Sequence, residues 1–221
     1  MKTLVSGCLF CLCLNAFAAT PAQKVNIKKF ESALMALRLP YSNRIQALNS
    51  VKGFKELCAI AEGKKFGLQA RWRAIMALGE VFPQKSVPKL ETFVQSREWF
   101  VRNSSILALA KSNRKQALVW SRKLLTDKAL VVRTAAVNVI AELKGEELAG
   151  ELWQQLNNPM NFKKGQSLWV RKHIVKALGE FAQLRQVNEF AHLLHDQDHR
   201  VQDAAMDVLE KLTGVKFASK N

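Results

Sequence analysis

Three of the four histidines of this 221-residue chain lie close together near its C-terminus, beside an aspartate. His192 and His195 are three residues apart, which places both on one face of a helix, and His199 follows Asp196 closely. Imidazole and carboxylate groups at such spacings can ligate a weakly bound transition metal. The spacing matches no metalloprotease motif such as His-Glu-x-x-His, so we expect a solvated polar turn and no metal.

The cysteines offer little for catalysis or for disulfide bonding. Cys8, Cys11 and Cys13 stand close to the N-terminus, and only Cys58 follows them. Cys58 falls four residues after Phe54 on a helical pattern, which is typical of a buried, inert thiol. No recognisable partner histidine stands near it, and both a Gly-x-Ser-x-Gly elbow and a glycine-rich phosphate loop are absent from the sequence. We therefore expect no catalytic residue, no enzyme activity and no cofactor.

An arginine that recurs at a fixed interval indicates how the chain is organised. Arg71, Arg102 and Arg133 are each 31 residues apart, Arg171 follows after a seven-residue interruption, and Gln202 stands another 31 residues on. Apolar residues occupy the positions one before, four after and seven after each of these, which is one face of a helix. A second, weaker apolar stripe precedes each helix. The sequence therefore predicts repeats of two antiparallel helices.

The turn inside each predicted repeat carries a residue suited to a helix N-cap. These residues stand six positions before the arginine or, in the interrupted repeat, before the insertion, and they are Ser96, Asp127, Asn158 and Asp196. Their side-chain oxygens can accept hydrogen bonds from free backbone N–H groups at the start of the second helix.

The pattern Asp-(x)4-Val-Arg-(x)2-Ala-(x)3-Ile, from Asp127 to Ile140, resembles the HEAT repeat, and its short form resembles the HEAT-like repeats of phycobilin lyases. The resemblance covers about residues 67–214. It implies an all-α fold, a right-handed α-solenoid of about five to six antiparallel helix pairs. It also implies that the repeated arginine pairs with the turn aspartate, as Arg133 with Asp127, or with neighbouring carbonyls. Arg102 and Arg171 lack an acid at their own turn, so we expect them to be freer to bind a ligand.

The first 18 residues have the pattern of a secretory signal peptide. Lys2 precedes an apolar run over residues 4–14, and Ala16-Phe17-Ala18 is a typical cleavage site. The run is too short to remain as a membrane span, and a lipoprotein signal at Cys8 is an alternative. We expect cleavage after Ala18 and a periplasmic or secreted protein. The remaining chain divides into an N-terminal cap with a degenerate first repeat (19–66), the repeats (67–214) and a tail (215–221).

Positive charge is concentrated in the first part of the chain. Residues 19–140 carry 22 Lys or Arg against 7 acids, whereas residues 141–221 carry 11 of each. A field of this size favours acidic partners and raises their rate of encounter. An acidic protein, anionic lipid headgroups, an anionic envelope polymer and nucleic acid are the candidates. The alternative is that the charge has no specific role.

A partner surface is expected on the second helix of the early repeats, because that helix lines the concave face in HEAT-like stacks. The positions one and five after each arginine are mostly polar, and apolar residues there mark a candidate interface. The candidates are Trp72, Met76 and Leu107, flanked by Arg71, Arg73 and Arg102. In the alternative, Trp72 packs under the N-terminal cap.

A seven-residue insertion between Asn158 and Val170 is a second candidate for recognition. Insertions in repeat proteins emerge as loops on one edge and often carry binding residues. We expect Met160, Phe162, Lys163 and Lys164 to form an apolar and basic tip, with Trp169 at its root. Deletion of residues 160–166 is expected to leave folding intact. A length variant without a role is the alternative.

Two families with related repeats perform chemistry. Phycobilin lyases act on a pigment inside cells, and alkylpurine DNA glycosylases carry a catalytic aspartate on a basic concave face. Here the concave acids Asp203 and Asp207 lie in the neutral last repeat, far from Trp72, and export argues against both settings. The sequence therefore predicts a non-enzymatic scaffold that binds an acidic partner protein. The runner-up is electrostatic binding of an anionic polymer or nucleic acid without sequence readout.

Overall fold

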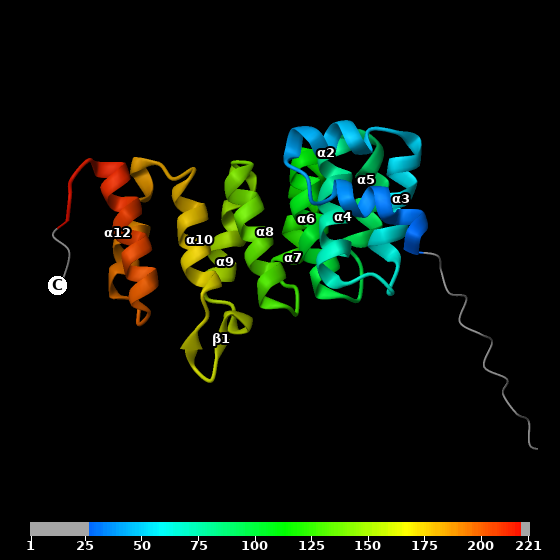
Figure 1. The fold of residues 1–221 in the computed structure, drawn as a ribbon. Coiled ribbons are helices and arrows are strands. Elements are labelled where there is room, and N and C mark those ends of the chain that lie inside the picture. The colour runs from blue at the N-terminus through cyan, green and yellow to red at the C-terminus, as the bar shows by residue number, and fades with distance from the viewer. Residues whose placement is uncertain (1–26, 218–221) are drawn as a thin grey trace, which may run out of the picture.

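The computed structural model describes residues 27–217, which fold into an α-solenoid (Figure 1). Five antiparallel helix pairs follow one another along the stack. The first helices of the pairs are α3 (Val51–Glu62), α5 (Pro83–Phe93), α7 (Arg114–Leu124), α9 (Ala149–Leu156) and α11 (Val187–His192). The second helices are α4 (Leu68–Val81), α6 (Trp99–Ser112), α8 (Leu130–Glu142), α10 (Val170–Gly179) and α12 (His199–Thr213). The expected signal peptide lies outside the described residues.

Short elements complete the stack. A 3-10 turn, η1 (Ile27–Phe30), and the helices α1 (Glu31–Ala36) and α2 (Tyr41–Leu48) precede the first pair. Further 3-10 turns are η2 (Glu146–Leu148), η3 (Pro159–Asn161), η4 (Leu184–Gln186) and η5 (Leu193–His195). No helix in the part of the chain described here is long and apolar enough to cross a membrane.

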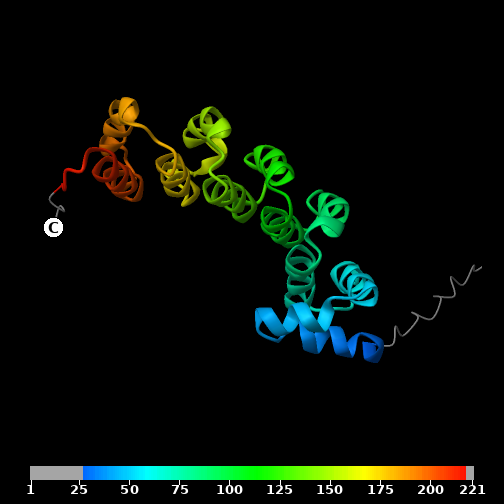
Figure 2. The same ribbon diagram turned by 90° about the horizontal axis from the view of Figure 1, so that it is seen from above.

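The five pairs form an arc in which the second helices lie on the inside and the first helices on the outside (Figure 2). Each second helix packs on the next one, from α4 to α12. The predicted apolar face of these helices is confirmed, since Ile75, Ile106, Val137 and Val175 are at most 1% exposed. Close approach is aided by Gly79, where a Cβ would stand 2.5 Å from the carbonyl oxygen of Ala108 on α6. The concave face therefore consists of the opposite sides of α4, α6, α8, α10 and α12.

The turn residues accept hydrogen bonds from backbone N–H groups that precede the second helices, and not from the first turn of those helices. In each turn the side-chain oxygen accepts the N–H two residues further on, at Glu98, Ala129, Met160 and Asp198. These bonds close a turn that leads into the helix, a motif open to Asp, Asn and Ser side chains. The prediction of N-caps for the second helices is therefore wrong in position, although the side chains do satisfy backbone N–H groups. The last helix, α12, ends at Gly214, whose φ of 72° is left-handed, and this is where the sequence predicted the repeats to end.

The N-terminal helices close one end of the arc. α2 packs on α4, and Arg44 of α2 binds Glu80 of α4 at 2.7 Å. Figure 2 shows these helices lying across the end of the concave face. α3 pairs with α4, so the first helix pair spans the division that we expected at residue 66.

The seven-residue insertion forms a small β-hairpin at the edge of the stack that carries the turns within the pairs (Figure 1). Strands β1 (Phe162–Lys163) and β2 (Gln166–Ser167) pair antiparallel. The two loop residues, Lys164 and Gly165, both have positive φ, of 51° and 77°. Positive φ at both loop residues is the geometry of a type I′ turn, whose twist suits a hairpin.

Candidate functional site: the arginine ladder and the concave face

Each repeated arginine reaches across to the following repeat. Arg102 binds both carboxylate oxygens of Asp127 at 2.7 Å, and Arg171 binds those of Asp196 at 2.9 and 2.6 Å. Arg71 likewise binds Glu98 at 3.1 and 2.5 Å. Two parallel bonds between a guanidinium and a carboxylate fix both partners in place. We call this series, together with Arg133, the arginine ladder.

Two expectations about these arginines are wrong. Arg102 and Arg171 are not free, because the acid that binds them belongs to the next repeat and not to their own turn. Arg71 and Arg102 are only 5% and 6% exposed, so neither offers its guanidinium to a partner on the concave face. The carboxylate of Asp127 accepts from Arg102, whereas Arg133 donates to the backbone oxygen of Asp127, at 2.7 Å.

The insertion supplies the missing partner of Arg133. Asn161 accepts a hydrogen bond from its Nε at 2.9 Å, and the carbonyl of Met160 accepts another at 2.7 Å. Asn161 is 1% exposed and also donates to the carbonyl of Gln155. Deletion of residues 160–166 would therefore leave a buried arginine without these acceptors, which corrects our expectation that the deletion is harmless.

The ladder lowers the pKa of its carboxylates. The hydrogen bond from Arg71 lowers the pKa of Glu98. Burial alone would raise the pKa values of Asp127 and Asp196, but the bonds from Arg102, Arg171 and backbone N–H groups outweigh it, and both pKa values are lowered. These acids are therefore ionised at neutral pH, and each stabilises an arginine. Burial lowers the pKa of Arg133, the member of the ladder bound by an amide in place of a carboxylate.

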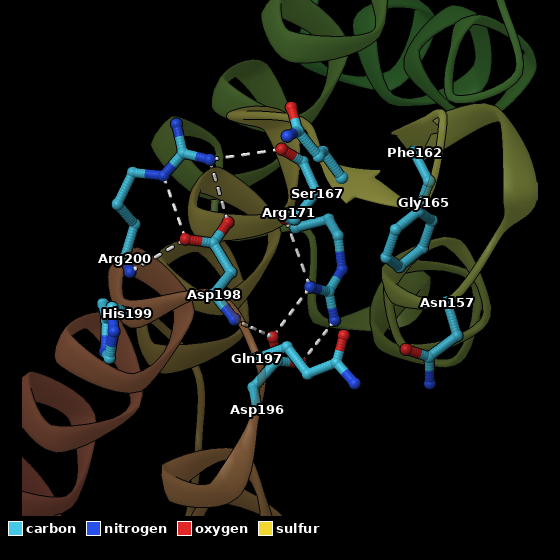
Figure 3. A pocket seen from close by; sticks show the side chains of 11 residues that line it. Asn157, Phe162, Gly165, Ser167, Arg171, Asp196, Gln197, Asp198, His199 and Arg200 are labelled. Carbon is cyan, nitrogen blue, oxygen red and sulfur yellow. Dashed lines mark hydrogen bonds and ion pairs between the residues drawn. The ribbon is translucent and has the colours of Figure 1, made fainter.

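A pocket of about 680 Å³ opens between the hairpin and the turn that leads into α12 (Figure 3). Arg171 forms part of its wall, covers the ring of Phe162 at 4.7 Å and binds Asp196. At its mouth Arg200 binds Asp198 and the carbonyl of Ser167, and the pKa of Asp198 falls to about 2. The charges in this pocket are therefore already paired with one another, which leaves them poorly suited to bind a charged ligand.

The residues considered for metal or thiol chemistry are not assembled into a reactive site. Among residues 27–217, no three His, Cys, Asp or Glu side chains come together in a way that could hold a metal ion. Burial raises the pKa of the half-exposed Cys58 thiol, which disfavours the reactive thiolate.

Trp72 lies on the concave face as expected, with 37% of its surface exposed, but Met76 does not. Met76 is only 8% exposed and stands one turn before Glu80, the residue held by Arg44. Since α2 covers this end of α4, Met76 is buried beneath the cap and is removed from the candidate surface. Arg73 is half-buried and has no hydrogen-bond or ion-pair partner within the described chain.

The concave face contains a small pocket of about 220 Å³ further along the arc, which we call the anchor pocket. The structure brings together Leu107 of α6 and Trp169, which the sequence assigned to two separate candidate sites. Trp169 is 46% exposed and its indole N–H donates to Thr134 at 2.9 Å, which fixes the ring against α8. The lining residues are Asn103, Leu107, Val131, Thr134, Ala135, Asn138 and Trp169.

Positive charge flanks the anchor pocket on the side of α10. His173 of α10 contacts Asn138 of the pocket at 2.8 Å. Burial and the charges of Lys172 and Lys176 lower the pKa of His173, so the imidazole is neutral at pH 7. Lys172 has no partner among the residues that the structure describes, and Lys176 makes only a loose pair with Asp207 at 3.6 Å. At least one lysine without a partner among the described residues therefore lies beside His173, next to the pocket residue Asn138.

The hairpin differs from the tip that we expected. Phe162 is half-buried under Arg171, so it does not project, and this part of the prediction is wrong. Lys163 and Lys164 are exposed, as is Met160 at 41%. Trp169 turns away from the tip and joins the concave face, as its place in the anchor pocket shows.

Comparison with known families supports this architecture. The model of HEAT repeats matches residues 55–141, from within α3 to α8. This stretch is therefore similar to HEAT repeats. A crystal structure of an engineered protein from the Northeast Structural Genomics Consortium is 19% identical, with a TM-score of 0.51 over 85% of this chain and 88% of that chain. A comparison with curated proteins gives no match.

HEAT repeats generally serve as scaffolds for protein interaction, and their fold is typically non-catalytic. The sequence identified the aromatic and apolar members of the concave face but missed its polar ones. Asn103 and Asn138 occupy the positions one and five after the repeated arginine, where the sequence indicated only that polar residues are common. Amide side chains at these positions can bind a ligand by hydrogen bonds, and this property was the signal that could have identified them from the sequence.

Proposed function

We propose that this protein is a non-enzymatic scaffold that binds an acidic partner protein on the concave face of its HEAT-repeat solenoid. The observation that carries the proposal is that the side chains of Trp72 and Trp169 are exposed, at 37% and 46%. Glu80 of α4 and Glu98, directly before α6, are already bound by arginine or lysine. Exposed aromatic residues with unpaired cations form the composition of an interface centre.

The setting of this function follows from the sequence alone. The leader-like pattern of residues 1–18 supports a periplasmic or secreted location, where the partner is then expected. The short repeat resembles the phycobilin-lyase type in length, and the proposal carries over no activity from that family.

Crosslinking from defined positions tests the proposal. A photoreactive amino acid at position 72 faces the concave side, and one at position 119 on α7 replaces Val119, which is 44% exposed on the outer row of helices. In living cells we expect position 72 to capture a discrete acidic protein that position 119 does not. Identical products from both positions, or no product from position 72, would overturn the proposal.

A second candidate function is electrostatic binding of an anionic envelope polymer or lipid headgroup. The exposed lysines Lys29, Lys52 and Lys55 surround an opening of about 460 Å³ whose apolar wall includes Phe30. This cluster lies on η1 and α3, away from the anchor pocket. Polyanion binding should weaken by orders of magnitude between about 50 and 200 mM salt, whereas capture by an apolar-centred protein interface should change much less.

A further inference from the structure

We infer that the anchor pocket binds an extended acidic segment of the partner protein and takes up one apolar side chain of that segment. The inference rests on the proposed function and deepens it, because it names the part of the concave face that is used and the chemistry that it recognises.

The size and lining of the pocket fit one side chain. Leu107, Val131 and Ala135 supply apolar surface, and the ring of Trp169 forms a wall. An apolar cavity of about 150 Å³ holds a benzene ring, so an open pocket of about 220 Å³ has room for one aliphatic or aromatic side chain. A single well-desolvated anchor of this kind supplies much of the binding energy at an interface.

The polar rim of the pocket favours an extended main chain over a helix. Asn103 uses its amide nitrogen to donate to the carbonyl of Val131 at 3.2 Å, and its own oxygen is left as an acceptor. Asn138 uses its oxygen to contact His173, and its amide hydrogens are left as donors. An extended segment presents unpaired backbone N–H and C=O groups to such side chains, whereas a helix has already paired its own.

The charge around the pocket favours acidic residues beside the anchor. Lys172 and Lys176 both act on His173, which contacts the pocket residue Asn138. On α8 the acid Glu142 lies at the far end of the helix from Val131, and the pocket has no acidic lining residue. An acidic residue next to the anchor side chain would therefore meet no carboxylate of the pocket lining, and Lys172 on the adjacent helix has no partner among the described residues.

Four short peptides test the inference with the full chain. Their central residue is leucine or serine, their flanking residues are glutamates or lysines, and binding is measured by isothermal titration calorimetry. We expect the leucine peptide with glutamate flanks to bind, and replacement of its leucine by serine to weaken binding by about 10-fold or more, because burial of the leucine is lost. Lysine flanks should abolish binding.

Two matched variants locate the site. Lys172→Glu should weaken binding of the acidic leucine peptide, whereas Lys115→Glu on the outer helix α7 makes the same change in net charge and should have little effect. Ala135→Leu fills the pocket and should remove the preference for leucine over serine. Leu107→Ser serves the same purpose if Ala135→Leu melts at a lower temperature than the wild type.

Each failure has a distinct meaning. Equal binding of the leucine and serine peptides, equal effects of the two charge reversals, or no binding by any peptide would overturn the inference. The proposed function is judged separately by crosslinking at position 72. A concave face that captures an acidic protein while the peptides show no anchor preference would retain the function and reject this pocket.

Discussion

The arginine ladder and the concave face contain the same kinds of side chain, which stabilise the stack in the ladder and remain available to a ligand on the concave face. Arg171 and Lys172 are neighbours on α10, yet Arg171 is 3% exposed and bound by a carboxylate, whereas Lys172 is half-exposed and has no partner among the described residues. The difference arises from the helix, because adjacent residues point about 100° apart. A cation that is fully paired stabilises the stack, and an unpaired one remains available to a ligand.

The concave face itself changes along the arc. At its C-terminal end, Lys176 of α10 pairs with Asp207 of α12 at 3.6 Å. Around Trp72 the cation Arg73 has no such partner within residues 27–217. An acidic partner is therefore expected to gain most binding free energy at the middle and N-terminal parts of the concave face.

The largest expected loss of unfolding free energy comes from breaking the arginine ladder. Arg102→Ala leaves the carboxylate of Asp127, which is 7% exposed, without its arginine. Removal of one member of a buried pair costs about 3–5 kcal/mol of unfolding free energy. Denaturant unfolding measures this loss, with the exposed Arg97→Ala as a control that should change stability by no more than about 0.5 kcal/mol. Equal losses in the two variants would mean that the ladder does not hold the repeats together.

A smaller loss of unfolding free energy is expected when the contact between the insertion and the arginine ladder is removed. Asn161→Ala removes one acceptor of Arg133 but leaves the carbonyl of Met160 in place. Loss of a buried hydrogen-bond partner costs about 1–3 kcal/mol. Lys163→Ala at the exposed strand of the same hairpin should leave the midpoint of unfolding nearly unchanged. If Asn161→Ala were as stable as Lys163→Ala, the hairpin would have no part in the ladder.

Acid should weaken the ion pair between Asp198 and Arg200 at the mouth of the larger pocket. A carboxylate whose pKa is lower in the folded state stabilises the fold above its unfolded pKa, and the contribution is lost as pH falls through the folded pKa. For Asp198 this range runs from its ordinary pKa of 3.8 down to about 2. Unfolding free energy measured across this range should fall less steeply in Asp198→Asn than in the wild type. Parallel curves would contradict the lowered pKa.

Much of the fold follows from the sequence because one period governs it. The arginine interval and the apolar positions around it predict the second helices, and residues such as Ile75 and Ile106 are buried as expected. What the sequence could not supply is the partner across the repeat boundary. Asp127 lies six residues before Arg133, yet its carboxylate binds Arg102. Proximity along the chain favoured the wrong arginine, since stacking places the turn of one repeat beside the preceding helix.

The candidate site was predicted less completely than the fold. Position within the repeat identified Trp72 and Leu107, but it could not show that α2 covers Met76, because the cap does not follow the period. Trp169 was assigned to the inserted loop on sequence position alone. Its hydrogen bond to Thr134, 35 residues away, places it on the concave face instead.

The smallest expected effect is a change in the pKa of a single histidine, His173, when a peptide binds. His173 has a pKa below its ordinary value because of burial and the charges of Lys172 and Lys176. A glutamate bound beside these lysines would offset their charge and raise the pKa of His173. Titration of the His173 ring by NMR, with and without the acidic leucine peptide, measures the change, and His192 serves as an internal reference. A rise at His173 alone would place the acidic residues next to α10, whereas equal changes at both histidines would indicate that the peptide acts only through the overall charge.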